Sequence, residues 1–220
     1  MAQNAQNMVN SISVWLTVAA IVVLSTAASA QDPTTSLPDS YRVQFENDYV
    51  RVVRVHYEAG AKLPDHTHPA GTTVYVYLND SDGVVFRHSG NNTRAVTRPA
   101  VKAGAIRISS GGEEHHTAEN NSSTASDFLR IFLKTENPGS RTMRRLPPNE
   151  AEYSTKQIRV TRIALEQHDE QAITAKEPAL LIEWPSGDEV WLDAGASRPI
   201  ANHDPRTVTF IRIDFLTKPR

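Results

Sequence analysis

Apolar and polar residues alternate with a period of two along much of the chain after residue 41. Segments 49–56, 72–78, 83–88, 105–108 and 127–133 are rich in Val, Ile, Tyr and Phe, and most are bounded by Gly, Pro, Asn, Asp or Ser. Because successive side chains of a strand point to opposite faces, this pattern predicts short strands in half-buried sheets. We therefore expect an all-β protein of the sandwich or jelly-roll type.

The strand pattern occurs twice in the chain. Residues 50–58 align with residues 158–166, and the spacing from Asn120 to Phe128 equals the spacing from Asn202 to Phe210. We interpret the two stretches as copies of one β unit, the second shorter in its middle. The alternative is a chance match between two amphipathic strands.

The first 30 residues differ from the rest because they contain no Asp, Glu, Lys or Arg. A mostly apolar run at 14–24 is followed by small residues that end in Ala28, Ser29 and Ala30. This is typical of a secretory signal peptide with an A-x-A cleavage site. An uncleaved anchor is the alternative, but the apolar run is short for a span of about 20 residues. The sequence therefore predicts a secreted or periplasmic protein, with no stable membrane insertion after cleavage.

These patterns predict five segments in the chain. We expect a signal peptide at 1–30, a loose lead-in at 31–40, a first β unit at 41–137, a linker at 138–152 and a second β unit at 153–220. The linker holds three prolines and a basic cluster made of Arg141, Arg144 and Arg145. A solvated basic linker is the simpler interpretation of this cluster than a binding patch.

Composition narrows the chemistry that the chain can carry. Its 220 residues include 23 Lys and Arg against 25 Asp and Glu, for a net charge of −2, so there is no basic excess to hold a nucleic acid. The chain has no Cys, which excludes disulfides, thiolate metal sites and cysteine nucleophiles. A metal site here must be built from histidines and carboxylates.

The histidines offer such a site. His66 and His68 share one face if their segment is a strand, whereas His115 and His116 follow beyond several further strands. Two imidazoles on one face and a third from a neighbouring strand make a three-nitrogen site with positions left open. Neutral imidazole suits several divalent metals, and we expect one ion of Fe, Zn, Cu, Mn or Ni.

Two segments resemble the paired motifs of the cupin superfamily. Gly60, His66 and His68 match the first motif, G-x5-H-x-H-x(3,4)-E-x6-G. The segment from Gly104 to Asn120 resembles the second motif, G-x5-P-x-G-x2-H-x3-N. The resemblance covers residues 41 to about 134, and the later part only through the internal repeat. It implies a cupin-type β jelly-roll barrel with a degenerate second cupin-like half.

The departures from the motifs concern the ligands. The glutamate of the first motif falls at Thr72 or Thr73, and the proline of the second is Ser110. The spacing from Gly112 selects His115 as third ligand, whereas the spacing to Asn120 selects His116. Adjacent strand residues face opposite sides, so only one of them fits, and we prefer His116. The resemblance thus implies His66, His68 and either His116 or His115 as metal ligands.

Two tyrosines and two further histidines lie on strands predicted near the expected site. Tyr75 and Tyr77 share a face with Thr73 and point into the predicted barrel. Tyr75 is the candidate catalytic residue, as a substrate contact or a proton donor, and the alternative is that it only fills the interior of the barrel. Tyr77 is expected to fill the interior of the barrel. His56 and His88 are expected to be surface or packed histidines.

The repeat alignment places Thr174, Lys176 and Arg198 where the first copy has His66, His68 and His116. Cationic side chains repel a metal ion, so the second copy is expected to be structural.

Three functions are compatible with these features. The first is a secreted metalloenzyme that acts on a small-molecule ligand, of the dioxygenase, lyase or isomerase type. The second is a non-catalytic periplasmic cupin that binds a metal or a small ligand, and the third is a cupin with a structural role and no metal. A homodimer through exposed sheet edges is expected, unless the internal duplication meets that need within one chain.

Overall fold

The computed structural model describes residues 31–89, 93–139 and 143–220. The signal peptide expected at 1–30 and Arg141 lie outside the described residues. Within the described part of the chain, no helix is long and apolar enough to cross a membrane. The elements before residue 140 are α1 (Pro33–Ser36), β1 (Tyr41–Glu46), β2 (Val50–Tyr57), β3 (Lys62–His68), β4 (Gly71–Tyr77), β5 (Val84–His88), β6 (Arg94–Thr97), β7 (Ile106–Gly111), β8 (Glu114–Asn120) and β9 (Ser126–Leu133). The later elements are β10 (Met143–Leu146), β11 (Glu152–Ser154), β12 (Ile158–Leu165), β13 (Glu170–Thr174), β14 (Ala179–Trp184), β15 (Glu189–Leu192), β16 (Ser197–Ala201) and β17 (Val208–Phe215).

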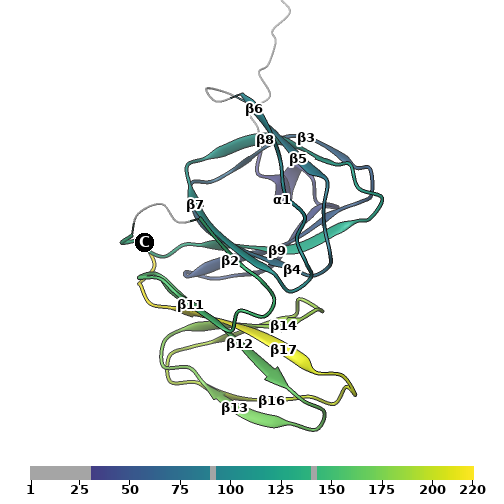
Figure 1. The fold of residues 1–220 in the computed structure, drawn as a ribbon. Coiled ribbons are helices and arrows are strands. Elements are labelled where there is room, and N and C mark those ends of the chain that lie inside the picture. The colour runs from purple at the N-terminus through teal and green to yellow at the C-terminus, as the bar shows by residue number, and fades with distance from the viewer. Residues whose placement is uncertain (1–30, 90–92, 140–142) are drawn as a thin grey trace, which may run out of the picture.

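The strands form four antiparallel sheets stacked one on another (Figure 1). Sheet 1 has the order β3-β8-β5-β6, and sheet 2 has the order β1-β2-β9-β4-β7-β10. Sheet 3 has the order β11-β12-β17-β14-β15, and sheet 4 pairs β13 with β16. The all-β prediction is confirmed. The hydrogen-bonded ladders of the described residues leave sheets 1 and 2 as a sandwich rather than one closed barrel.

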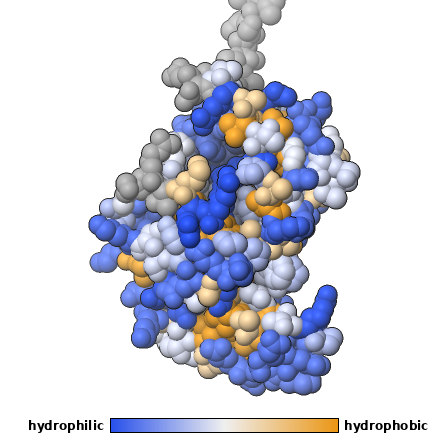
Figure 2. Space-filling view, viewed as in Figure 1, coloured by the Kyte–Doolittle hydropathy of each residue, from blue (hydrophilic) through white to orange (hydrophobic). Residues whose placement is uncertain are grey.

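Three apolar cores separate the four sheets. The first core lies between sheets 1 and 2 and includes Val55, Tyr75 and Phe128. The third lies between sheets 3 and 4 and includes Ile173 and Phe210. On this view, outward positions are largely hydrophilic, with apolar surface gathered at a few places over each half (Figure 2).

The second core joins the two halves of the chain. It combines Val52 and Ile131 of sheet 2 with Ile182 and Ile213 of sheet 3, all with no exposed surface. Sheet 2 therefore buries both faces, which explains why β4 and β9 are buried at almost every position. The two halves stabilise each other through this shared core.

The two halves repeat one pattern of pairing. Val50 of β2 lies opposite Leu133 of β9, and the aligned Ile158 of β12 lies opposite Phe215 of β17. The duplication predicted from the sequence thus has the same register in both copies.

A buried asparagine also recurs in each copy. The amide nitrogen of Asn120 donates to the carbonyl oxygens of Tyr57 and Thr124, at 3.1 and 2.9 Å. That of Asn202 donates to the aligned carbonyl of Leu165 at 2.9 Å and to that of the residue four positions on, at 2.8 Å. Buried amides of this kind hold a turn in place because they bond to carbonyls of two different segments.

Two segments are more ordered than the sequence suggested. The lead-in is not loose: it forms α1, and Asp32 at its N-cap makes an ion pair with Arg51 at 2.6 Å. Within the expected linker, Met143–Leu146 forms β10, which extends sheet 2 by pairing with β7. The linker therefore places Arg144 and Arg145 at a sheet edge.

Candidate functional site

Three histidines meet inside the first sandwich. His66 and His68 lie on β3 and His116 lies on β8, where His116 is directly opposite His66. Their exposed fractions are 0, 5 and 2 %, and one ring nitrogen from each lies within 4.8 Å of the others. Among the described residues, no carboxylate joins this group. Sequence and structure thus agree on the set His66, His68 and His116.

His115 does not join the group. Its side chain is 43 % exposed, and its Nε2 lies 3.1 Å from a carboxylate oxygen of Glu113. Its Nδ1 lies 3.1 Å from the hydroxyl of Thr67, on the outer side of sheet 1. The reason is the strand period of two, which turns His115 outward when His116 points inward. His115 is therefore set aside as a candidate ligand.

A bulge aims His66 at His116. The pairing of β3 with β8 shifts register between Leu63 and His66, which inserts one extra residue on β3. Bulges re-aim side chains in this way and are common beside functional sites. The Nδ1 of His66 also donates to the carbonyl oxygen of Pro64 at 2.8 Å, within the bulge. This bond fixes the tautomer, so the lone pair of His66 lies on Nε2.

Burial keeps the histidines neutral. Burial lowers the pKa of His66 and lowers that of His68 well below its usual range. Burial, together with the nearby charges of His66 and His88, lowers the pKa of His116 to about 2. Neutral imidazole is the form that binds a metal ion.

The donor set fits a divalent metal. Both ring nitrogens of His116 are buried, and neither has a hydrogen-bond partner. Leaving such groups unsatisfied costs free energy, and a cation that accepts the lone pair of one of the two nitrogens removes part of that cost. The ring centroid of His116 lies 4.8 Å from that of His66 and 5.1 Å from that of His68. Three converging imidazoles without a thiolate suit Fe, Zn, Cu, Mn or Ni rather than an alkaline-earth ion.

Tyr75 lies on sheet 2, on the face that packs against sheet 1. It is opposite Arg107 of β7 on one side and Arg130 of β9 on the other. Its side chain is 5 % exposed, and the guanidinium carbon of Arg107 lies 4.3 Å from its ring centroid. Burial raises the pKa of Tyr75, but the positive charges of the arginines, Arg130 first, outweigh burial and lower it. Tyr77 is buried in the first core, in agreement with a filling role.

Two residues beside the histidines, Tyr41 and Arg130, escaped the sequence analysis, whereas His88 was expected to be a surface or packed histidine. The hydroxyl of Tyr41 lies 2.9 Å from Nε2 of His66. Arg130 is 7 % exposed, and its Nε has no hydrogen-bond partner. The ring of His88, on β5, stands edge-on to that of His116 with centroids 5.3 Å apart. Only Arg130 gave a local signal, because it shares the inward face of its strand with Phe128.

The positions expected for a fourth ligand carry no acid. Thr72 and Thr73 are buried at 3 and 4 % exposure, and the hydroxyl of Thr72 accepts a hydrogen bond from Asn137 at 3.0 Å. Glu119 pairs with Lys62 and Arg87 on the outer side. The three histidines are thus the complete candidate donor set in the described residues.

A cavity of about 130 Å³ reaches one of the three histidines, His68. Tyr41 and Arg130 also line it, together with Asp32 and Pro33 of the α1 region. The lead-in segment therefore forms part of the wall of this cavity.

The second half has no equivalent site. Its counterparts of β3 and β8 are β13 and β16, and neither contains a histidine. Arg198 takes the place of His116, as the repeat alignment indicated, but it lies opposite Ile173 rather than Thr174. The one-residue difference arises because β13 lacks the bulge of β3. Lys176 falls beyond the end of β13.

No family model matches the chain, and no curated protein matches its sequence. Its structure is similar to that of AerE from Microcystis aeruginosa, with 11 % identity, a TM-score of 0.55, and coverage of 80 % of this chain and 91 % of that one. It is also similar to the putative glyoxylate-induced protein from Pseudomonas aeruginosa, with 12 % identity, a TM-score of 0.55, and coverage of 81 and 79 %. A cupin domain from Bordetella pertussis matches at 22 % identity and a TM-score of 0.36, over 43 % of this chain and 91 % of that one. The chain therefore shares its fold with the first two of these structures. Membership of the cupin superfamily, which the two sequence motifs predicted, stays a prediction.

Proposed function

We propose that this protein is a secreted cupin metalloprotein that binds one divalent metal through His66, His68 and His116 and acts as an enzyme on a small molecule. The observation that carries the proposal is the convergence of three buried imidazoles, with ligand atoms within 4.8 Å of one another. The two buried ring nitrogens of His116, which have no hydrogen-bond partner, support the proposal independently.

The surrounding residues define what the site can do. A bound metal would supply Lewis-acid or redox chemistry, since three protein ligands leave positions open. Phe86 and Leu63 belong to the first core and keep bulk water away from the histidines. Tyr75 can hold or release a proton beside the arginines that lower its pKa. This combination suits reactions of the dioxygenase, lyase or isomerase type.

One observation favours a second candidate function. Because Thr72 and Thr73 replace the glutamate of the cupin motif, the site lacks the carboxylate that the motif supplies. A non-catalytic periplasmic protein that binds a metal or a small ligand would need no such group. Such a binder would be stabilised by its ligand without turning it over.

The first experiment measures metal content by mass spectrometry. The mature chain, residues 31–220, is produced in the periplasm without a His tag and compared with the double variant His66→Ala/His68→Ala. We expect about one metal per wild-type chain and loss of that metal in the double variant. His115→Ala is the matched control, because this histidine neighbours His116 but faces outward, and it should retain the metal. A wild-type protein that stays empty after incubation with Fe(II), Zn, Mn, Ni and Cu(II) would refute the proposal.

Secretion is tested separately. We expect cell fractionation to recover the protein outside the cytoplasm, with Gln31 at its N-terminus. A protein that keeps residues 1–30 and stays with the membrane would favour the uncleaved anchor instead.

A further inference from the structure

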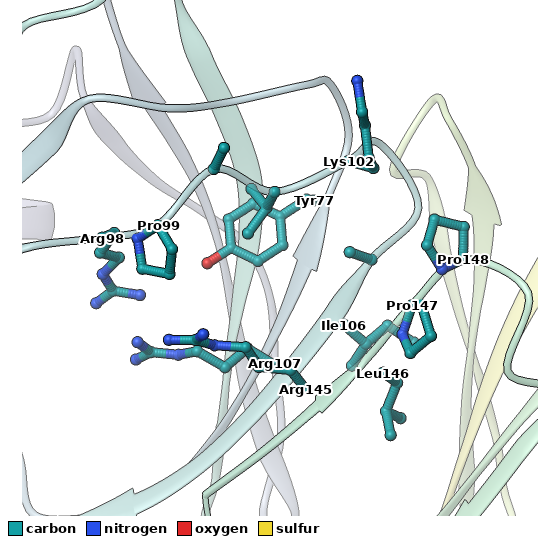
Figure 3. Close-up of a pocket in the computed structure, with 13 residues that line it drawn as sticks. Tyr77, Arg98, Pro99, Lys102, Ile106, Arg107, Arg145, Leu146, Pro147 and Pro148 are labelled. Atoms are coloured by element: carbon teal, nitrogen blue, oxygen red, sulfur yellow. The ribbon is translucent and has the colours of Figure 1, made fainter.

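A second cavity, of about 240 Å³, lies at the other end of sheet 2 (Figure 3). It is lined by residues of β4, β7 and β10 and of the loop that follows β6. Four basic residues line it, namely Arg98, Lys102, Arg107 and Arg145, and no acidic residue does. We call this cavity the basic pocket.

Strand register gathers the positive charges. Arg145 of β10 lies opposite Arg107 of β7, and Arg107 in turn lies opposite Tyr75 of β4. Figure 3 shows the guanidinium groups of Arg98, Arg107 and Arg145 on one side of the pocket, toward which the hydroxyl of Tyr77 also points. The structure thus brings together three arginines that are far apart in the sequence.

These arginines have no counter-charge in the described residues. Two nearby basic residues do have a counter-charge, since Lys102 pairs with Asp80 at 2.6 Å and Arg144 pairs with Glu150 at 2.9 Å. No such ion pair forms at Arg98, Arg107 or Arg145 among the residues that the structure describes. The Nε of Arg107 is buried without a hydrogen-bond partner. Burial and the like charge of Arg98 both lower the pKa of Arg107. Such a cluster favours the approach of an anion.

The opposite side of the pocket is apolar. Pro147 and Pro148 are exposed on this side, together with Ile106 and Leu146, which belong to the second core and are only 1 and 2 % exposed. In Figure 3 these residues lie away from the guanidinium groups. A ligand that satisfies both sides needs an anionic head and an apolar body. Planar guanidinium groups match the two oxygens of a carboxylate.

We propose that the basic pocket binds a small carboxylic acid with an apolar body, its carboxylate held by Arg98, Arg107 and Arg145. The body lies along Pro147 and Pro148. An inorganic anion would leave the apolar wall without a contact, and a neutral molecule would leave the three arginines without a counter-charge.

The pocket adjoins the histidine site through its arginines. The guanidinium carbon of Arg98 lies 4.3 Å from the ring centroid of Phe86, and that ring lies 4.9 Å from the ring of His116. Arg107 contacts Tyr75 in the same way on sheet 2. A bound acid is therefore a candidate substrate of the metal site, a link that rests on the proposed function, whereas binding itself does not.

Isothermal titration calorimetry on the mature chain tests the proposal, with benzoate as the probe. Benzyl alcohol is the neutral counterpart, and inorganic phosphate is the anion without an apolar body. We expect saturable binding of one benzoate per chain, no binding of benzyl alcohol, and weaker binding of phosphate. No saturable binding of benzoate, or equal binding of either comparison compound, would overturn the inference.

Two neighbouring arginines of β10 provide matched variants. Arg145→Gln should weaken benzoate binding by about tenfold or more, because a charged hydrogen bond is lost. Arg144→Gln removes the same charge one residue away, from the side chain paired with Glu150, and should leave the affinity unchanged. Arg145 is exposed, so its variant does not disturb the core. An equal loss in both variants would show a nonspecific effect of charge and contradict the proposal.

The metal site is separated from the pocket by repeating the titration on His66→Ala/His68→Ala with a chelator present. Benzoate binding that persists there supports the pocket whatever the metal content. A wild-type chain that holds its metal but does not bind benzoate overturns the pocket and leaves the metal proposal standing.

Discussion

The hydroxyl group of Tyr41 donates a hydrogen bond to Nε2 of His66, with a distance of 2.9 Å between the two atoms. The direction follows from the other ring nitrogen, since Nδ1 of His66 donates its proton to the carbonyl oxygen of Pro64. Tyr41 thus occupies the lone pair that a metal would use, and it comes from β1, outside the motifs that identified the histidines.

Replacing Tyr41 with Phe should therefore strengthen metal binding. The variant removes one hydrogen bond that competes with the metal, which corresponds to about 0.5–1.5 kcal/mol, or roughly a two- to tenfold gain in affinity. Competition with a chromogenic chelator measures this change. Tyr49→Phe is the control, because Tyr49 packs against Trp191 and Phe215, away from the histidines. Unchanged or weaker binding by the Tyr41 variant would contradict the competition.

Metal removal should lower the thermal stability of the protein. A ligand that binds only the folded state stabilises it by about 2.7 kcal/mol at one hundred times its dissociation constant. For a chain of this size that corresponds to roughly 5–10 °C in Tm. Thermal unfolding with and without chelator measures the difference, which should vanish in His66→Ala/His68→Ala. A Tm that responds to chelator equally in both proteins would argue against this site.

Tyr75 should ionise below the ordinary tyrosine pKa of 10.0. Burial opposes ionisation, but the charges of Arg130, Arg107 and Arg98 favour it more. Between the folded pKa and 10.0 the unfolded chain holds a proton that the folded chain has released. The contribution of Tyr75 to stability therefore grows with pH across that window, is complete above it, and is lost as the pH falls through the folded pKa.

An absorbance titration of tyrosinate measures this ionisation. The early component should disappear in Tyr75→Phe. Tyr57 and Tyr41 ionise later, since burial raises the pKa of Tyr57 to about 12 and raises that of Tyr41 well above its usual value. An early component that survives in Tyr75→Phe would assign it to another tyrosine.

The shared second core should make the two halves unfold together. Ile213 of sheet 3 has no exposed surface and packs in this core with residues of sheet 2. Ile213→Ala should lower the free energy of unfolding by about 2–5 kcal/mol. Leu216→Ala, at 38 % exposure, should cost much less.

Calorimetry and tryptophan fluorescence check the cooperativity of unfolding. Both should report one transition at the same temperature, shifted as a whole by Ile213→Ala. Two transitions, of which the substitution moves only one, would show that the halves fold independently.

The sequence by itself predicted the strand content, the duplication and the pair His66 and His68. These features depend on local alternation, which fixes the face that each side chain of a strand takes. The period of two allowed only one of His115 and His116 to be a ligand, and the spacing to Asn120 favoured His116. The signal peptide stays a prediction, since it lies outside the described residues.

Other features depended on tertiary structure. The bulge before His66 changes the register of β3, whereas β13 has no bulge. Ile173 rather than Thr174 therefore faces Arg198 in the second half. The assembly of Arg98, Arg107 and Arg145 around one pocket follows from the pairing of strands distant in the chain. Tyr41 reaches His66 for the same reason. Alternation determines which face a residue occupies, whereas register and sheet packing determine which distant residue it meets there.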